Sequence, residues 1–299
     1  MNIQYTIIIP HYNLPDLLER LLNSIPKRKD VQVIVVDDCS TFSHLMDLSK
    51  LQFSFSDVEF YSTAVNGGGG KARNVGLEYA KGKYVIFADA DDFFTPEFSE
   101  ILSTYQNTEE YDIIYFNNTS VDSDTLLPSN RNNQLSSFFK IANKDSERAL
   151  LALRYIFGEP WCKIVKRELI EMNGIRFDET PIHNDTKYSY LVGYYGNRIK
   201  LDDRIGYCIT SRSESVSKQI SNEKLLIRTQ IFSDKMKFLK SNAIPLIDPL
   251  VFTPTIKALK SANISFLKKV LKVMKESGYS KYSFLRDYLR FRKKGYFID

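Results

Sequence analysis

The chain has 299 residues, is 43% hydrophobic and 26% charged, and carries a net charge of +5. That length allows one large core or two modest ones, and that composition is ordinary for a globular protein rather than a disordered or fibrous one. Its 3 cysteines are scattered without CxxC spacing, which argues against a disulfide framework or a zinc site and fits a reducing cytoplasm. No apolar run approaches the roughly 18 residues of a membrane span, and the N-terminus lacks a signal-peptide pattern.

The first predicted strand is Tyr5–Ile9, a β-favouring run that Pro10 stops. Residues 11–13 follow as a loop. Leucines at helical spacing then predict a helix over residues 14–25.

A second buried strand is predicted at Val31–Val36, and it ends in Asp37 and Asp38. It brings carboxylates to its carboxyl end, where open α/β sheets bind ligands. The alternative is that Asp38 only caps a turn or a helix.

A run of four glycines at residues 67–70 follows a third predicted strand, Val58–Ser62, and leads into a helix that Gly82 is expected to end. Such a loop offers free amides and the positive end of a helix dipole to an anion, and Lys71 and Arg73 add charge. The alternative is a flexible turn. The run fails as a Walker A motif at two positions, and a dinucleotide fingerprint belongs after a first strand, so neither is expected.

The apolar run Tyr84–Ala88 predicts a strand covered on both faces, and it ends in Asp89, Asp91 and Asp92. Adjacent carboxylates repel, so such a cluster needs a cation, a hydrogen-bond network or open water. Oxygen-only ligands suit Mg²⁺ or Mn²⁺, which commonly bridge to phosphates. The alternative is a solvated acidic turn that caps the helix opening at residues 95–97.

The second half of the chain begins with a predicted strand, Asp112–Phe116, followed by polar residues 117–137 that predict a long surface loop bordering the site. Helices are predicted at Ser146–Phe157 and Lys166–Asn173. Between them lies Trp161, the only tryptophan, which is either part of the core or a wall on which a sugar stacks.

A helix at Asn184–Gly193 and a late strand at Ile205–Ile209 complete the predicted α/β part. Long helical patterns then replace the strands, which places a domain boundary near residue 216. From Lys257 to the end, twelve Lys and Arg residues stand against three acidic ones, a net charge of +9, so the first 256 residues sum to −4.

Within the basic tail, residues 264–276 carry apolar side chains on one side of a predicted helix and four lysines on the other. Either this helix packs on the body with a solvated basic face, or it lies on an anionic membrane surface. No recognised module accompanies the basic residues, so nucleic-acid binding is not expected.

Four blocks of sequence, in this order, resemble the family 2 glycosyltransferases, whose fold is called GT-A: Thr6–Asn13, Val33–Thr41, Asn66–Gly76 and Tyr84–Phe94. Weaker similarities follow at Trp161–Leu169, Asn184–Asp185 and Arg212–Ser217. The resemblance covers roughly residues 3–217. It implies an α/β catalytic domain over residues 1–216, with a mostly parallel sheet flanked by helices, and a basic helical extension over residues 217–299.

The resemblance also assigns roles to individual residues. Those implied to bind the donor nucleotide are Pro10, Tyr12, Asp38, Gly69, Lys71, Arg73, Asp89 and Ala90. Within this set, Asp38 would accept a hydrogen bond from the base. Asp89 and Asp91 match the DxD motif, with Asp91 as the direct metal ligand and Asp89 reaching the ribose or the metal through water. Asp185 matches the catalytic base, and the acceptor side would hold Trp161, Lys163, His183 and Arg212.

Three positions depart from the family pattern. Asn184 precedes Asp185 where the family usually has an acidic residue, which weakens the assignment of the base and leaves His183 as a rival. Cys39 replaces a common glycine, and Glu214 occupies a position that is more often glycine.

The activity implied is an inverting, metal-dependent transfer, with Mn²⁺ or Mg²⁺, from a UDP-linked sugar to a glycan or lipid-linked glycan acceptor. Bacterial members of this layout build surface polysaccharides such as capsules, and the basic tail suits a cytoplasmic enzyme at the inner face of the membrane. Two rivals stay open. A nucleotidyltransferase would use the same carboxylates, metal and nucleotide but release pyrophosphate. A catalytically inactive scaffold subunit would bind the donor without turning it over.

Overall fold

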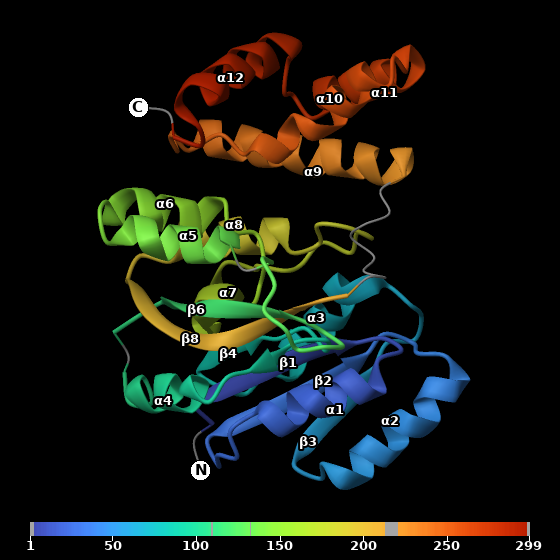
Figure 1. Cartoon of the computed structure of the whole chain (residues 1–299), viewed down its shortest axis with the longest axis vertical. Coiled ribbons are helices and arrows are strands. Elements are labelled where there is room, and N and C mark those ends of the chain that lie inside the picture. Colours follow the sequence, from blue (N-terminus) through green and yellow to red (C-terminus); the bar gives the residue numbers. More distant parts are fainter. Residues whose placement is uncertain (1–2, 109, 132, 213–220, 298–299) are drawn as a thin grey trace.

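The computed structural model describes residues 3–108, 110–131, 133–212 and 221–297 (Figure 1). These residues form an α/β body, with a layer of helices from the C-terminal part of the chain at the end far from the N-terminus. Eight strands of the described residues form one sheet: β1 (Tyr5–His11), β2 (Val31–Asp37), β3 (Val58–Ser62), β4 (Tyr84–Phe87), β5 (Phe93–Phe94), β6 (Ile113–Asp122), β7 (Lys163–Lys166) and β8 (Ile199–Ser211).

The sheet has the strand order β3-β2-β1-β4-β7-β6-β8-β5, and its first four strands run parallel. The register places His11 beside Asp37 and Ile8 beside Phe87, so the carboxyl ends of β1, β2 and β4 lie at one edge. All four residues of β4 are buried, as expected for a strand covered on both faces. The carboxylates that follow β2 and β4 are therefore delivered to the same edge of the sheet.

The predicted loop over residues 117–137 was wrong. Strand β6 continues to Asp122 and pairs in parallel with β8, and a helix begins at Asn133. The side chains of residues 117–122 are mainly polar and hid the strand, but ladder hydrogen bonds come from the backbone and do not need apolar side chains. Strand β7 was not predicted from the sequence. It lies between β4 and β6 and pairs antiparallel with both.

Helices of the body lie on the sheet: α1 (Pro15–Ser24), α2 (Phe42–Ser54), α3 (Gly68–Tyr79), α4 (Glu97–Thr104), α5 (Asn133–Ala142), α6 (Ser146–Tyr155), α7 (Arg167–Met172) and α8 (Thr186–Tyr195). Gly82 does not end α3, whose C-cap is Ala80. Instead it lies against β1, where a Cβ atom would be 2.5 Å from the Thr6 backbone nitrogen. Glycine is required at position 82 because the backbone there packs closely on the backbone of β1.

The helical extension consists of α9 (Asn222–Ser241), the 3-10 helix η2 (Pro249–Val251), α10 (Thr253–Lys260), α11 (Ile264–Glu276) and α12 (Lys281–Lys294). Helix α9 lies between the body and the outer helices, in contact with both α8 and α11 (Figure 1). The expected boundary near residue 216 falls outside the described residues. Over the described residues, no helix combines the length and the apolar character that crossing a membrane requires.

The apolar side of α11 is packed, because Phe266, Val270 and Met274 are buried against the other helices. This supports the first of the two interpretations of residues 264–276. The centre of this apolar face is therefore covered, while Ile264 and Leu271 stay exposed.

Candidate functional site

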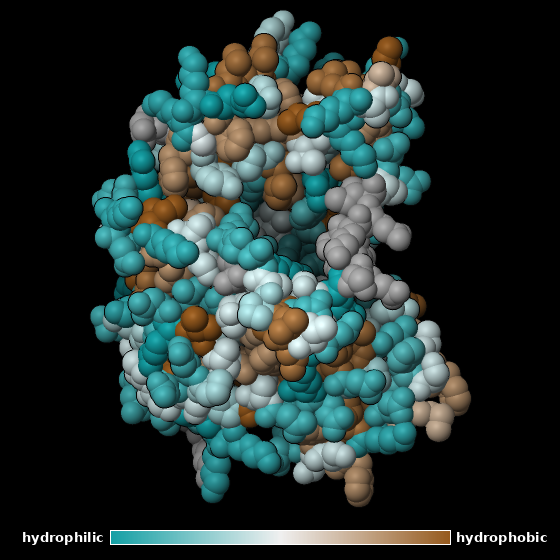
Figure 2. Space-filling view, viewed as in Figure 1, coloured by the Kyte–Doolittle hydropathy of each residue, from teal (hydrophilic) through white to brown (hydrophobic). Residues whose placement is uncertain are grey.

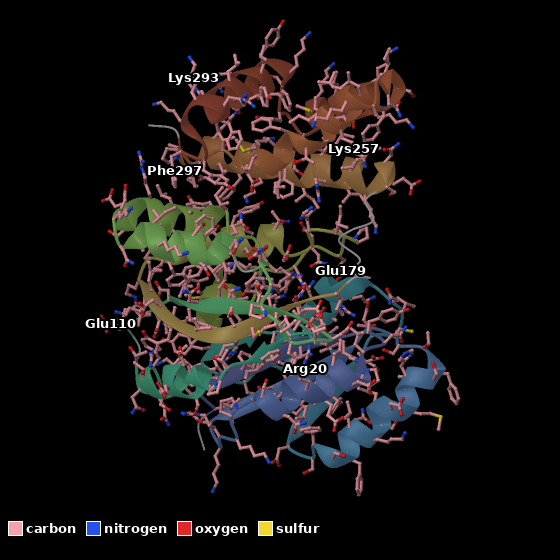
Figure 3. The ribbon with its side chains drawn as sticks, viewed as in Figure 1. Arg20, Glu110, Glu179, Lys257, Lys293 and Phe297 are labelled. Atoms are coloured by element: carbon pink, nitrogen blue, oxygen red, sulfur yellow. The ribbon has the colours of Figure 1, made fainter. Side chains whose placement is uncertain are left out.

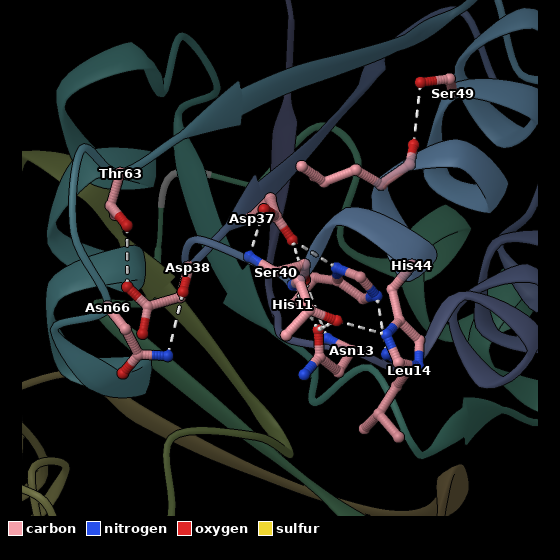
Figure 4. A network of polar contacts seen from close by, with 12 residues as sticks. His11, Asn13, Leu14, Asp37, Asp38, Ser40, His44, Ser49, Thr63 and Asn66 are labelled. Atoms are coloured by element: carbon pink, nitrogen blue, oxygen red, sulfur yellow. Dashed lines mark hydrogen bonds and ion pairs between the residues drawn. The ribbon is translucent and has the colours of Figure 1, made fainter.

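A closed network of polar contacts joins the ends of β1 and β2 (Figure 4). The buried Asp37 carboxylate lies 2.8 Å from His11 Nδ1 and accepts hydrogen bonds from the Ser40 amide and hydroxyl. His11 Nε2 accepts from the Leu14 amide at 3.1 Å, so the ring is neutral and Nδ1–H donates to Asp37. Burial alone would raise the pKa of Asp37, but the bonds from His11 and Ser40 hold it below its ordinary value.

Asp38 holds the glycine run in place. Its carboxylate accepts hydrogen bonds from the Gly67 amide at 3.0 Å, the Gly68 amide at 2.6 Å and the Thr63 hydroxyl at 2.9 Å. Neighbouring Cys39 has a left-handed φ of 63°, a conformation that favours glycine. The structure therefore gives Asp38 a structural role at the candidate donor edge, and the expected bond to a nucleotide base stays a prediction.

Helix α3 begins inside the glycine run and closely approaches a segment far along the chain. A Cβ atom on Gly70 would be 2.1 Å from the Asp178 carbonyl oxygen. Only glycine permits this contact, which brings the segment before α8 against α3. Arg73 then bridges the two parts, because its guanidinium donates to Asp89 at 2.6 Å and to Asn184 at 3.1 Å.

The carboxylates after β4 form a cluster in which one oxygen from each of Asp89, Asp91 and Asp92 lies within 4.8 Å of the others. Asp91 is ion-paired with Arg212 at 2.7 Å, as Asp89 is with Arg73. Asp92 points into the interior, where Oδ1 accepts from the Thr210 amide. Burial, and then the charges of Asp91 and Asp89, raise the pKa of Asp92 well above its ordinary value.

This cluster fits a divalent cation. All its donors are oxygens, which suits Mg²⁺ or Mn²⁺. Among the residues that the structure describes, the buried Oδ2 of Asp92 has no hydrogen-bond partner, as expected for an atom whose partner is a cation or a ligand. Asp89 and Asp91 are ion-paired with Arg73 and Arg212, and of these two arginines only Arg212 has a substantially exposed side chain.

Asp185 and Asp89 both line a cavity of about 190 Å³. Asp185 is the N-cap residue of α8 but makes no capping hydrogen bond with its side chain. Burial raises the pKa of Asp185, although the positive charge of Arg73 opposes the shift. A carboxylate with a raised pKa is a better proton acceptor from a hydroxyl than an ordinary one.

The residues expected on the acceptor side fall in different places. Trp161 packs against Phe157 and Tyr207 and also lines the cavity. Lys163 is buried, and its ammonium donates to the Phe157 carbonyl and the Ser189 hydroxyl. Burial lowers the pKa of Lys163 to about 7.

His183 and Arg212 lie on opposite sides of the site. His183 Nε2 accepts a hydrogen bond from Arg228 of α9 at 2.9 Å, and burial lowers the pKa of His183 to about 4. Its lone pair is therefore engaged. Arg212 lies on the cluster, paired with Asp91, rather than near Trp161.

The other expected donor residues lie along the edge. Tyr12 is 45% exposed beyond β1, next to the partly buried Pro10. Gly69 and Lys71 lie in the first turn of α3, and Ala90 is buried between Asp89 and Asp91.

Four polar residues of the 190 Å³ cavity are not among those predicted from the sequence: Asn118, Arg131, Gln134 and Glu159. The first three fall in the segment predicted to be a loop. Glu159 lies two residues before Trp161, and that proximity was the available signal. A larger cavity, about 760 Å³, shares Asn118 with this one but has Asp203 as its only carboxylate among the described residues.

Comparisons with known proteins place this arrangement in context. Residues 6–172 match the sequence model of the family described as Glycosyl transferase family 2. The poly(ribitol-phosphate) beta-N-acetylglucosaminyltransferase TarS of Staphylococcus aureus is 30% identical over 219 residues, which cover 70% of this chain and 36% of TarS. A poly(ribitol-phosphate) beta-glucosyltransferase of Bacillus spizizenii is 32% identical over 183 residues, which cover 60% of this chain and 27% of that protein. This chain thus corresponds to about a third of the length of these relatives.

Solved structures share the fold. Residues 1–349 of S. aureus TarS in complex with UDP-GlcNAc align with a TM-score of 0.62 and 20% identity, covering 99% of this chain and 100% of that one. The mannosyltransferase PcManGT of Pyrobaculum calidifontis, in complex with GDP-Man and Mn²⁺, aligns with a TM-score of 0.53 and 17% identity, covering 97% of this chain and 81% of that one. The expected fold, a mostly parallel α/β sheet with a C-terminal helical part, is confirmed.

Proposed function

The chain belongs to the glycosyl transferase family 2, and we propose that it transfers a sugar from a UDP-linked donor to a hydroxyl group of a glycan or lipid-linked glycan acceptor. The observation that carries this proposal is the single cavity lined by both Asp89 of the carboxylate cluster and Asp185. In this proposal, Asp89 belongs to the group that binds the leaving diphosphate and Asp185 accepts the proton, and the shared cavity would hold the reacting sugar.

The donor side is formed by the edge of the sheet. Asp38 holds the glycine run, and the base would lie near Tyr12 and Asp38, with the diphosphate toward Arg73 and the cluster. Asp91 and Asp89 would hold a Mn²⁺ or Mg²⁺ ion, which offsets the negative charge of the leaving nucleoside diphosphate. Arg73 and Arg212 are placed to pair with phosphate oxygens when they leave these carboxylates.

Asp185 is the proposed general base. It takes the proton of the acceptor hydroxyl as the oxygen attacks the anomeric carbon and the bond to the nucleoside diphosphate breaks. With Asp185 acting as a base and not as a nucleophile, the reaction is a single displacement, so the configuration at the anomeric carbon would invert. His183 is a poorer candidate because its Nε2 atom is already bonded to Arg228.

The acceptor class follows from the relatives. Two of them are named for transfer to poly(ribitol-phosphate), and a third is the minor teichoic acid biosynthesis protein GgaB of Bacillus subtilis. We therefore include teichoic-acid-type polymers, beside capsule-type glycans, among the acceptors to test.

A screen of donors tests the proposal. Thermal unfolding is measured with UDP-, GDP- and dTDP-linked sugars, with and without Mn²⁺, because a ligand that binds only the native state raises the midpoint. The preferred donor is then incubated with acceptors, and the released nucleotide is identified. Release of UDP with transfer supports the proposal. Release of pyrophosphate would instead indicate a nucleotidyltransferase, and binding without turnover an inactive scaffold.

The helical extension is proposed to contact an anionic membrane through α12 rather than α11. The outer side of α12 exposes Tyr282, Leu285 and Leu289, which are spaced by one turn each, while Phe284 and Tyr288 on its inner side pack on Phe252. Exposed basic residues surround this apolar stripe, namely Lys281, Arg286, Arg290, Arg292, Lys293 and Lys294. Lys257 and Lys293 lie in the same helical end of the molecule (Figure 3). This combination suits a surface of anionic lipids.

Co-sedimentation with vesicles tests this contact. Binding to vesicles that contain phosphatidylglycerol should fall with added salt and with the double change Leu285→Glu and Leu289→Glu. Changing Lys268 and Lys269 to Gln on α11 lowers the net charge by the same two units and gives a matched control for charge alone. Binding that ignores both salt and the α12 changes would contradict the proposal.

A further inference from the structure

A second cavity, of about 260 Å³, lies between the body and the helical extension. Its walls include Phe232 and Lys235 of α9 and Leu250 of η2, and on the body side Glu159 and Asp185. The space-filling view shows a hollow between the two parts of the molecule (Figure 2). The volume is close to the lower end for small-molecule pockets, which start at roughly 300 Å³. It therefore fits a ligand of about one sugar or polyol unit.

This cavity adjoins the one that Asp89 of the carboxylate cluster lines. Gln134, Glu159 and Asp185 line both of them. Asp185, the proposed base, therefore lines both the cavity next to the candidate donor site and the cavity next to the helical extension. A ligand in the second space would have a hydroxyl group within reach of the base.

The charges of the walls favour a neutral ligand. The Lys235 ammonium is 1% exposed and pairs with Asp248 at 2.6 Å, so its charge is already compensated. The carboxylates of Glu159 and Asp185 make no hydrogen bond or ion pair with another side chain among the residues that the structure describes, although each accepts a bond from its own backbone amide. These carboxylates repel an anion and can accept hydrogen bonds from hydroxyl groups. Phe232 and Leu250 supply apolar walls of the kind that sugar rings contact.

We infer that this cavity is an acceptor subsite that holds one neutral, hydroxyl-bearing unit, a sugar or a polyol, with Glu159 as its hydrogen-bond acceptor. The inference rests on the proposed function and goes beyond it, because it makes the helical extension part of the acceptor site. The buried Lys235–Asp248 pair keeps α9 and η2 in position as the wall of the subsite. Any phosphate linkage of the acceptor would lie outside the cavity.

Direct binding of small probes tests the subsite without requiring turnover. Saturation-transfer NMR is recorded with the full chain and with ribitol, N-acetylglucosamine or ribitol phosphate as the probe. Leu250→Trp fills the mouth of the cavity at a residue that is 37% exposed, so the fold should tolerate it. Leu259→Trp, at a residue 61% exposed on α10, is the matched control.

We expect a neutral probe to bind both the unmodified chain and the Leu259→Trp variant. With Leu250→Trp, the saturation-transfer signal of the neutral probe should be lost. Ribitol phosphate should bind no better than ribitol. Glu159→Gln should weaken the neutral probe while UDP binding stays unchanged. The inference is overturned if no neutral probe binds, or if Leu250→Trp and Glu159→Gln leave probe binding intact. Failure of the proposed function would be seen differently. In that case the chain would still bind the probe but would release no UDP with any donor and acceptor.

Discussion

Two Asp-Asp pairs follow buried strands at the same edge of the sheet, Asp37–Asp38 and Asp91–Asp92, and the structure uses them in opposite ways. The first pair is bonded to backbone amides, hydroxyls and His11, all within the protein. In the second pair, Asp91 is bonded to a long arginine side chain, and Asp92 has a buried oxygen without a hydrogen-bond partner among the described residues. Carboxylates whose oxygens are all bonded to backbone amides and neighbouring side chains hold a structure together, whereas a carboxylate paired with a partly exposed arginine, or one with an unbonded oxygen, can take a ligand.

The largest effect is expected at Asp185, which lines the same cavity as Asp89. Asp185→Asn keeps the size of the side chain but cannot accept a proton, so turnover should fall by roughly 10²–10⁴ while donor binding is retained. His183→Ala should cost much less because His183 is bonded to Arg228. Transfer rates at saturating donor compare the two variants. Near-normal turnover for Asp185→Asn beside an inactive His183→Ala would assign the base to the histidine.

The next effect is expected at Asp91. Asp91→Ala should abolish the metal-dependent part of UDP binding and leave the fold intact, because Asp91 lies at the partly exposed edge of the cluster. Calorimetry with UDP, with and without Mn²⁺, measures it. Asp203→Ala, at an exposed carboxylate on β8, is the control. Unchanged affinity in Asp91→Ala would mean that the cation lies elsewhere.

A smaller effect is expected at Asp38. Asp38→Ala removes the acceptor of the Gly67 and Gly68 amides, so we expect UDP binding to weaken by about 1–3 kcal/mol and the unfolding midpoint to fall. Calorimetry and thermal unfolding of the same sample separate the two roles. A lower midpoint with unchanged UDP affinity would restrict Asp38 to holding the glycine run.

The smallest effect is expected at Asp37, and it depends on pH. Because the pKa of Asp37 is lowered in the folded state, its stabilisation is present above the ordinary Asp pKa of about 3.9 and is lost as the pH falls through the lowered value. Asp37→Asn should therefore lower the free energy of unfolding by about 1–3 kcal/mol at about pH 7 and by less at about pH 3. Urea unfolding at both pH values measures it, and a difference independent of pH would contradict the assignment.

Much of the site could be read from the sequence because its signals are local. A buried strand shows as an apolar run, and its end shows as a change to polar residues, so the carboxylates after β2 and β4 were placed at the correct edge. The start of α8 at Thr186 similarly placed Asp185 just before a helix. These patterns depend on residues adjacent in the chain, whose geometry is set by the backbone.

Contacts between distant residues were decided only by the tertiary structure. Arg228 engages His183 across 45 positions, and Arg73 reaches Asn184 across 111. The sequence could not show that Glu159 and Asp185 share two cavities. Nor could it show that α11 buries the centre of its apolar side while α12 exposes an apolar stripe. The packing of the elements decides which face of a helix is covered and which carboxylate has hydrogen-bond partners. Because the elements lie in space in an order that differs from their order in the chain, no local sequence pattern encodes these contacts.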